Sequence, residues 1–490
     1  MSLTFTPVIG LEIHVQLATK SKIFCSCSTD YIGAVPNTNV CPLCLGLPGT
    51  LPVLNAKVVE YGVQAALALN CKVLNSTIFH RKNYFYPDLP KAYQISQYDL
   101  PLAEHGYIDI TSDNGSTRQI RITRLHLEED AGKLVHGASD GRIAGSSQSF
   151  VDYNRAGVPL AEIVSEPDLR SPAEARQYVS AIRQLVRYLG VSDGDMENGS
   201  LRVDANVSVK CSDGRWGERA EVKNLNSLKA LERALGYEIE RHEAILSDGE
   251  EVLQETRHWN DTEGITMATR SKEEANDYRY FPEPDLPPLV LSDEYINKQK
   301  EKLPELPWHR RDRFQKDYGL PEDYSFAITE DADIADFFEA CLKFGGSPER
   351  IVNWIRTEVL KILNERKMRL KELPVTAEMV ADITTRIDKR QLSNTAAKEV
   401  FEYMISKGCD LKSAASACGI SFGGVGKDEL RSLVSKIVSD NGDVADIIRS
   451  GNDKKGKKLK FLQGLVMRET RGQSDPAEVA EILQDMIKGD

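Results

Sequence analysis

The sequence has few cysteines and no long hydrophobic run. No window approaches ~18 consecutive apolar residues, so we expect no helical membrane span. The N-terminus, MSLTFTPVIGLEIHVQL, carries neither a charged leader nor a long apolar stretch, which argues against a signal or transit peptide. The nine cysteines are an odd number in 490 residues, and a disulfide framework is not expected in so long a chain without a secretion signal. These absences predict a cytoplasmic protein.

Familiar nucleotide-binding and hydrolase motifs are also missing. No G-x-x-x-x-G-K-[ST] string occurs, and the nearest, SFGGVGKD at 421–428, lacks the first glycine and the final hydroxyl residue. No G-x-G-x-x-G follows a strand, and no G-x-S-x-G elbow is present. If this chain handles nucleotides, it does so with an unusual fold.

Acidic residues outnumber basic ones, 74 to 62, so the net charge is −12. Any contact with nucleic acid therefore requires a local basic patch. Asn452–Arg471 is such a patch, with a local balance of +5, and a solvated loop and helix start is the alternative reading. Its basic residues are Lys454, Lys455, Lys457, Lys458, Lys460, Arg468 and Arg471.

The length predicts two to four domains with ordinary globular composition. Short strand-like runs with intervening helices extend to about residue 295, which predicts an α+β domain with an antiparallel sheet. From about residue 297 onward only amphipathic helices are expected, in two pieces divided near 406–412. The main predicted strands are Val8–Leu17, Gln119–Leu127 and Leu201–Lys210, and the main predicted helices are Ala56–Leu69, Pro172–Leu189, Leu228–Leu246, Ala335–Phe344, Pro348–Glu365, Ala377–Ile387, Leu392–Lys407, Leu430–Ser439 and Ala477–Lys488.

Four of the nine cysteines lie within twenty residues, as Cys25-x-Cys27 and Cys41-x-x-Cys44. Two such pairs can supply four thiolates to one tetrahedral ion, so we favour structural zinc over a set of free buried thiols. A redox Cys-x-x-Cys is less favoured because the second pair would then have no role.

Three segments place acids or histidine in strand-like surroundings. Glu12 and His14 alternate with apolar residues in Val8–Leu17, HLEED covers 126–130, and Glu162 lies inside an apolar run. Carboxylates in such runs are costly unless they are paired or bind an ion. Together they suit Mg²⁺, which takes few protein ligands and leaves positions for phosphates. For Glu12 and His14 alone, an exposed sheet face is the simpler reading.

Cations and aromatic residues are interleaved in RKNYFYP at 81–87 and KAYQ at 91–94. This mixture suits contacts with phosphate and with adenine or ribose.

Many long motifs, in order, resemble one known family. They are VIGLEIHVQL, NTNVCPLCLGLPGTLPVLN, RKNYFYPDLPKAYQISQYD, ITRLHLEEDAGK, DYNRAGVPLAEIVSEPD, GSLRVDANVSV, AEVKNLNS, QETRHWN, DYRYFPEPDLPPL and FLQGLVMRETRGQSDP. The chain is similar over nearly its whole length to the B subunits of aspartyl/glutamyl-tRNA(Asn/Gln) amidotransferases (the GatB/GatE family).

The resemblance implies a cradle-like catalytic domain over 1–296, a helical domain over 297–408 and a tRNA-binding tail domain over 409–490. It implies a heterotrimer of this chain with an amidase, the A subunit, and a small C subunit. The heterotrimer would act on Glu-tRNA(Gln) or Asp-tRNA(Asn). The B subunit would phosphorylate the side-chain carboxylate with ATP and Mg²⁺, and ammonia supplied by the amidase would then complete the amidation.

The resemblance also implies roles for particular residues. His14, Glu129 and Glu162 would bind Mg²⁺ with Glu12 nearby, although Glu128 is the alternative to Glu129 because the apolar alternation changes phase near Arg124, which suggests a β-bulge. Weaker candidates for phosphate or substrate contacts are Lys82, Tyr84, Lys91 and Arg124. Cys25, Cys27, Cys41 and Cys44 would hold structural zinc, and Lys454, Lys455, Lys457 and Lys458 would contact tRNA.

Two other functions are consistent with parts of the sequence. One is a tRNA-binding scaffold without chemistry, and the intact set Glu12, His14, Glu129 and Glu162 argues against it. The other is a zinc hydrolase, which four thiolates argue against because they would leave no open position on the ion.

Overall fold

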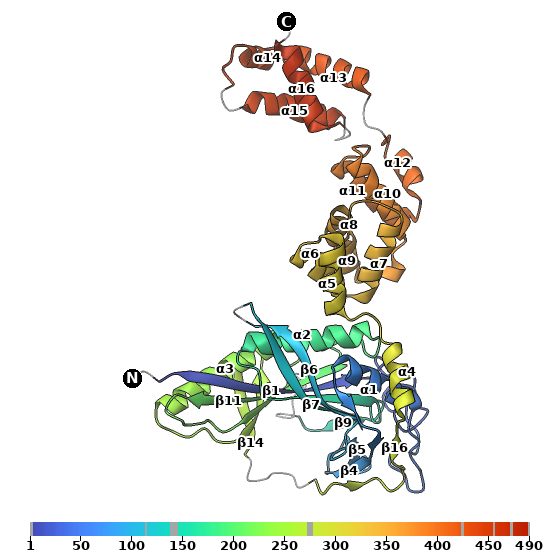
Figure 1. Ribbon diagram of the computed structural model, residues 1–490, viewed down its shortest axis with the longest axis vertical. Coiled ribbons are helices and arrows are strands. Elements are labelled where there is room, and N and C mark those ends of the chain that lie inside the picture. The colour runs from blue at the N-terminus through green and yellow to red at the C-terminus, as the bar shows by residue number, and fades with distance from the viewer. Residues whose placement is uncertain are drawn as a thin grey trace. The chain divides into compact units, whose positions relative to one another are not determined.

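The computed structural model describes residues 3–112, 115–137, 146–271, 278–422, 426–453, 456–470 and 474–488. The chain divides into two compact units, Met1–Leu306 and Pro307–Asp490. The first is built on a large sheet with helices, and the second is helical throughout its described residues (Figure 1). The expected α+β class, with a mostly antiparallel sheet followed by an all-helical region, is confirmed.

One twelve-stranded sheet organises the first unit. Its main path runs β14-β13-β12-β11-β1-β10-β7-β5-β4-β15, and β6 pairs with both β7 and β2. Among the described residues the pairs are antiparallel except for β12 with β13. The strands are β1 (Phe5–Gln16), β2 (Lys72–Val73), β4 (Phe79–Asn83), β5 (Tyr93–Gln97), β6 (Ala103–Thr111), β7 (Thr117–Glu129), β10 (Pro159–Ser165), β11 (Leu201–Cys211), β12 (Ala220–Lys223), β13 (Glu255–Asn260), β14 (Ile265–Ser271) and β15 (Phe281–Pro282). Two small sheets pair β3 (Ser76–Thr77) with β16 (Leu289–Val290), and β8 (Lys133–His136) with β9 (Ser149–Asp152).

Helices cover one face of this sheet. α2 (Pro172–Tyr188) packs on β1 and β6, and α3 (Leu228–Ser247) packs on β11 and β14 (Figure 1). α1 (Ala56–Ala68) packs on β7 and is followed along the chain by strands, while α4 (Asp293–Glu301) packs on α1. The β1 side chains Leu11, Ile13 and Val15 are buried on this side, as strict alternation requires. The opposite face is left for polar side chains.

Local signals explain where the long helices begin. The Ser171 side chain accepts a hydrogen bond from the backbone N–H of Glu174, and Pro172 occupies the first turn of α2. Ser227 caps α3 in the same way through Ala230. In α1, Gly62 permits close approach to the sheet, because a Cβ there would lie 2.9 Å from a methyl carbon of Leu127.

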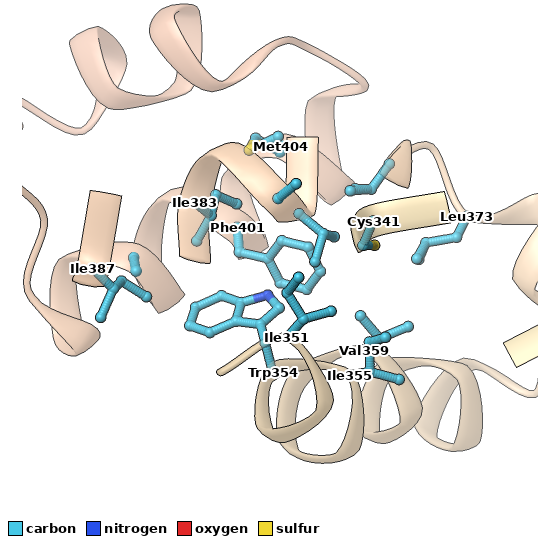
Figure 2. Close-up of a cluster of buried hydrophobic side chains, with 14 of the residues drawn as sticks. Cys341, Ile351, Trp354, Ile355, Val359, Leu373, Ile383, Ile387, Phe401 and Met404 are labelled. Atoms are coloured by element: carbon cyan, nitrogen blue, oxygen red, sulfur yellow. The ribbon is translucent and has the colours of Figure 1, made fainter. Parts of the chain in front are cut away.

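The second unit contains two separate hydrophobic clusters. The first spans residues from Phe314 to Ile420, and Figure 2 shows its centre, where Trp354 and Phe401 meet edge to face at 5.6 Å. The second spans residues from Leu430 to Ile487. The helices are α5 (Pro307–Tyr318), α6 (Glu322–Thr329), α7 (Ala332–Lys343), α8 (Pro348–Trp354), α9 (Leu360–Arg366), α10 (Ala377–Asp388), α11 (Asn394–Lys407), α12 (Leu411–Ala417), α13 (Lys427–Asp440), α14 (Gly442–Arg449), α15 (Lys457–Glu469) and α16 (Pro476–Lys488).

The expected helix over 348–365 is one helical run but not a uniform one. Residues Ile355–Val359 form a π-helical turn between α8 and α9. Periodicity cannot foresee this turn, because one inserted residue changes the hydrogen-bond register without removing the apolar face. Most other predicted helices begin and end within a few residues of the observed ones.

Candidate active site

The candidate site includes the polar side chains of β1. Glu12 and His14 alternate with the buried Leu11 and Ile13, as expected. His14 lies opposite Glu162 of β10 on one side and opposite Arg202 of β11 on the other. Directly opposed residues of antiparallel strands point to the same face, so three charged side chains meet there.

β7 adds a histidine and a carboxylate to the same face. His126 lies opposite Glu162, and Glu128 follows two residues later on the same side of the strand. His126 Nε2 lies 3.1 Å from a Glu162 oxygen, and His14 Nε2 lies 3.4 Å from the same oxygen. Glu128 oxygens lie 3.7 Å from each of these two imidazole nitrogens. We call His14, His126, Glu128 and Glu162 the acidic cluster.

His126, Glu128 and Glu162 are buried and His14 is half-buried, and the contacts among them favour their charged forms. Burial alone would raise the pKa of Glu162, but His126 and His14 lower it well below its usual range. Burial likewise opposes ionisation of Glu128, yet hydrogen bonding to His126 lowers its pKa. The two acids raise the pKa of His126 to about 9 against the effect of burial. Both directions favour the ionised form of these two adjacent carboxylates.

Part of this cluster can hold a metal ion. One ligand atom each from His14, Glu128 and Glu162 lies within 4.8 Å of the others. Two carboxylates and one imidazole leave several coordination positions for other oxygens, which fits Mg²⁺ with bound phosphates. Removal of two carboxylates from water is costly, and a divalent cation would offset that cost.

Glu129 lies away from this set. Its carboxylate forms an ion pair with Lys91 and accepts a hydrogen bond from the backbone N–H of Ile95 at 2.9 Å. Neighbouring residues of a strand face opposite sides, so Glu128 and Glu129 cannot both reach the acidic cluster. The structure therefore brings Glu128, and not the expected Glu129, to His14 and Glu162. A register shift opposite Arg124, between Val164 and Ser165, confirms the predicted bulge.

Glu12 lies beside the acidic cluster, but its hydrogen-bond partner lies outside that cluster. Its carboxylate accepts a hydrogen bond from the Asn206 amide at 2.9 Å. Burial and the charge of Glu162 raise the pKa of Glu12. Farther along, Lys223 bridges Asp204 at 2.9 Å and Glu221 at 3.0 Å. Lys223 thus offsets part of the negative charge on this side of the face.

Lys82 and Tyr84 extend the polar face across β4. Burial opposes the charge of Lys82, but Glu128 raises its pKa above the ordinary value, and its ammonium lies 4.9 Å from the Tyr278 ring centre. Burial raises the pKa of Tyr84, whose hydroxyl lies 3.4 Å from the Gln94 side-chain oxygen. Arg124 is half-buried on β7 and has no ion-pair partner among the described residues.

Sequence reasoning named Glu128 only as the alternative to Glu129, and it gave no role in the site to His126, Asp130 or Arg202. The signal for His126 and Glu128 was present, because both sit two residues apart in HLEED, like Glu12 and His14 in β1. Nothing local marked Arg202, since its position depends on the pairing of β11 with β1.

The four cysteines of the N-terminal loop converge. Their sulfurs lie within 4.8 Å of one another, which is compatible with tetrahedral zinc. The ammonium of Lys22 is fully buried, 3.7 Å from Cys44 Sγ, and interaction with Cys25 lowers the pKa of Cys44 to about 4. The same interaction raises the pKa of Cys25, and burial raises that of Cys27 to about 11, so the buried cation and the low pKa of Cys44 together indicate one thiolate in the cluster.

The basic patch coincides in part with α15. Lys457 and Lys458 are exposed at the start of that helix, and Asp453 accepts hydrogen bonds there from the backbone N–H groups of Lys458 and Leu459 at 3.0 Å. Phe461 is exposed on the next turn. Lys454 and Lys455 lie outside the described residues.

Comparison with known proteins accounts for both units. Residues 7–297 match the model of the GatB/GatE catalytic domain, and residues 336–487 match that of the GatB domain. Three similar relatives come from Thermoanaerobacter pseudethanolicus, Carboxydothermus hydrogenoformans and Thermotoga maritima; all three are named as B subunits of aspartyl/glutamyl-tRNA(Asn/Gln) amidotransferases. Each is 48% identical to this chain and is aligned over 99% of it. The alignments cover 99%, 99% and 100% of the relatives, respectively.

The sheet with its acidic cluster, together with these matches, defines a component of an ATP-dependent ligase of the amidotransferase class. The chain belongs to the family of aspartyl/glutamyl-tRNA(Asn/Gln) amidotransferase B subunits. Within the described residues, no helix is both long and apolar enough to cross a bilayer.

Proposed function

We propose that this chain phosphorylates the side-chain carboxylate of Glu-tRNA(Gln), Asp-tRNA(Asn) or both, using ATP, and then amidates it with ammonia. The carrying observation is the acidic cluster, in which two carboxylates and two imidazoles lie close together on one face of the sheet. Such a cluster suits phosphoryl transfer, where positioning and charge compensation supply most of the catalysis.

Two balanced steps describe the reaction. A carboxylate oxygen of the substrate attacks the γ-phosphorus of ATP, the bond to the β-phosphate breaks, and an acyl phosphate and ADP result. Ammonia then attacks the acyl carbon, inorganic phosphate leaves with the bonding electron pair, and the nitrogen loses a proton. In this proposal ammonia comes from an amidase, the A subunit, and a small C subunit makes up the heterotrimer.

The residues of the chain have separate tasks in this scheme. His14, Glu128 and Glu162 would hold Mg²⁺, which supplies offsetting positive charge for the phosphate oxygens when bound. Glu12 lies next to them and accepts a hydrogen bond from the Asn206 side chain. Lys82, Tyr84, Lys91 and Arg124 are proposed phosphate or substrate contacts, with Lys91 held by Glu129.

The remaining regions have supporting roles. Residues 1–296 are the proposed catalytic domain and 297–408 a helical domain. Cys25, Cys27, Cys41 and Cys44 would bind structural zinc, since four thiolates leave no open position for chemistry. Residues 409–490 are the proposed tRNA-binding domain, and the exposed lysines at the start of α15 support that role.

The test measures ADP formed from ATP by the complex of this chain with its amidase and small partner subunits, with ammonium chloride in place of glutamine. We expect ADP with Glu-tRNA(Gln) or Asp-tRNA(Asn), none with uncharged tRNA, and at least a ~100-fold loss of rate in Glu128→Gln. ADP formation that ignores the aminoacyl group, or an unaffected Glu128→Gln variant, would leave the scaffold function as the better account.

A further inference from the structure

Arg202 is a charged residue of the polar face that the scheme above does not use. It lies in β11 directly opposite His14. Opposed side chains of antiparallel strands share a face and are adjacent, so Arg202 borders the acidic cluster. Burial would lower its pKa, but Asp130 and, more weakly, Glu128 raise it, which places both acids within electrostatic reach of the guanidinium.

A chain of hydrogen bonds fixes one side of this guanidinium. Arg202 Nη2 donates to Asp130 Oδ2 at 2.8 Å, and the Gln16 amide donates to the same oxygen at 3.0 Å. The Tyr31 hydroxyl in turn donates to the Gln16 side-chain oxygen at 3.0 Å. Tyr31 belongs to the loop between Cys27 and Cys41, so the cysteine loop reaches the polar face through this tyrosine.

The other side of the guanidinium is unused. Arg202 Nε is buried and has no hydrogen-bond partner among the described residues. About a third of the side chain, 34%, remains exposed. A guanidinium has five N–H donors; Asp130 accepts from one, and because Nε is buried, the donors left to match a carboxylate or phosphate are the remaining Nη hydrogens.

The second arginine at Asp130 gives a contrast. Arg155 Nε lies 3.6 Å from Asp130 and donates to the carbonyl of Ala131 at 3.0 Å, while Arg155 Nη2 donates to the carbonyl of Gly132 at 2.6 Å. Arg155 therefore donates its hydrogen bonds to backbone carbonyls. Arg202 does not, although both arginines are partners of Asp130.

We propose that Arg202 binds an oxyanion of the substrates beside the acidic cluster, and that Tyr31 positions it through Gln16 and Asp130. This inference rests on the proposed function. The oxyanion is either the side-chain carboxylate of the aminoacyl-tRNA or a phosphate of ATP. In this arrangement the cysteine loop helps to position Arg202, because the loop holds Tyr31 and Tyr31 acts on one side of the guanidinium.

The test compares Arg202→Ala and Arg202→Lys in the full complex by steady-state ADP formation, varying ATP and aminoacyl-tRNA separately. We expect kcat/KM to fall about 100-fold in Arg202→Ala, and Arg202→Lys to recover only part of it because lysine lacks the fork. A rise in KM for ATP alone identifies the phosphate, and a rise for aminoacyl-tRNA alone identifies the carboxylate. Arg121→Lys, an exposed arginine paired with Asp168, is the matched control and should behave as wild type.

Chemical rescue distinguishes binding from a structural role. Millimolar guanidinium should restore part of the activity of Arg202→Ala and none of the activity lost in Glu128→Gln. Tyr31→Phe should retain zinc and raise the same KM about threefold, and it should add little to Arg202→Lys because both act through one guanidinium.

Two results overturn the inference while leaving the proposed function intact. One is an Arg202→Ala complex with wild-type kinetics. The other is a loss of activity that parallels a lower thermal midpoint and that guanidinium does not restore. A wild-type complex that forms no ADP with charged tRNA would count against the proposed function first, and against this inference with it.

Discussion

His14 and Glu162 face each other across β1 and β10, and His14 Nε2 lies 3.4 Å from a Glu162 oxygen. The two residues are far apart in sequence, and the pairing of two strands is what brings them together. Each member of the acidic cluster is placed by a strand pairing of this kind, so the cluster and the sheet register cannot be separated.

The choice between two neighbouring acids can be tested directly. Glu128→Gln should raise the Mg²⁺ concentration needed for half-maximal ADP formation about 10- to 100-fold, because it removes a charged ligand. Glu129→Gln should leave that concentration unchanged, since Glu129 pairs with Lys91 outside the acidic cluster. A Mg²⁺ titration of both variants decides the matter, and the reverse order of effects would contradict the ligand set proposed here.

Metal analysis addresses the cysteine loop. After extensive dialysis we expect about one zinc per chain in the wild type and its loss in Cys27→Ser, with a thermal midpoint lower by about 5 °C or more. Cys409→Ser, outside the cluster, is the control and should retain both zinc and stability. Dialysed wild-type protein without zinc would contradict the proposal.

A buried ion network at α3 predicts acid sensitivity. Glu238 is fully buried and meets Arg241 at 2.8 Å and Arg257 at 3.0 Å. Burial opposes its ionisation, but His242, Arg241 and Thr266 lower its pKa from 4.5 to about 2. Because the folded pKa lies below the unfolded one, the stabilisation is fully present above pH 4.5 and is lost as the pH falls toward 2.

Denaturant unfolding of Glu238→Gln against pH measures this effect. The wild type should exceed the variant by about 3 kcal/mol in free energy of unfolding at pH 7, and the gap should shrink below about pH 4.5. Glu240→Gln, exposed on the same helix, should show no such gap. A difference that stays constant down to about pH 3 would argue against the network.

The start of α15 offers a test of the tail. Lys457→Glu with Lys458→Glu should weaken tRNA binding about tenfold near physiological salt, and should reduce the slope of log affinity against log salt by about 2. Filter binding over a salt series measures both quantities. Lys316→Glu, exposed in α5, is the control, and equal losses in both variants would point to general charge repulsion.

The sequence predicted the local elements well because their causes are local. Alternation marked β1, a helical pattern of apolar residues marked α2 and α3, and the spacing of the cysteines marked one loop. The π-helical turn at Ile355–Val359 was missed, since it leaves the apolar face intact.

The sequence could not decide whether Glu128 or Glu129 faces the metal site. The bulge opposite Arg124 was expected, but a bulge makes the face of each following residue uncertain until the pairing with β10 is known. Arg202 shows the same limit, because only the pairing of β11 with β1 brings it beside His14.

The sequence by itself determined which chemical groups this protein has available and the elements that carry them: acids and histidines in strands, four thiols in one loop, and lysines at the start of a helix. The tertiary structure alone decided which of those groups meet. The reason is that side chains alternate along a strand with a period of two, so a shift of one residue in the pairing of β10 with β7 would send His126 and Glu128, half of the acidic cluster, to the covered face.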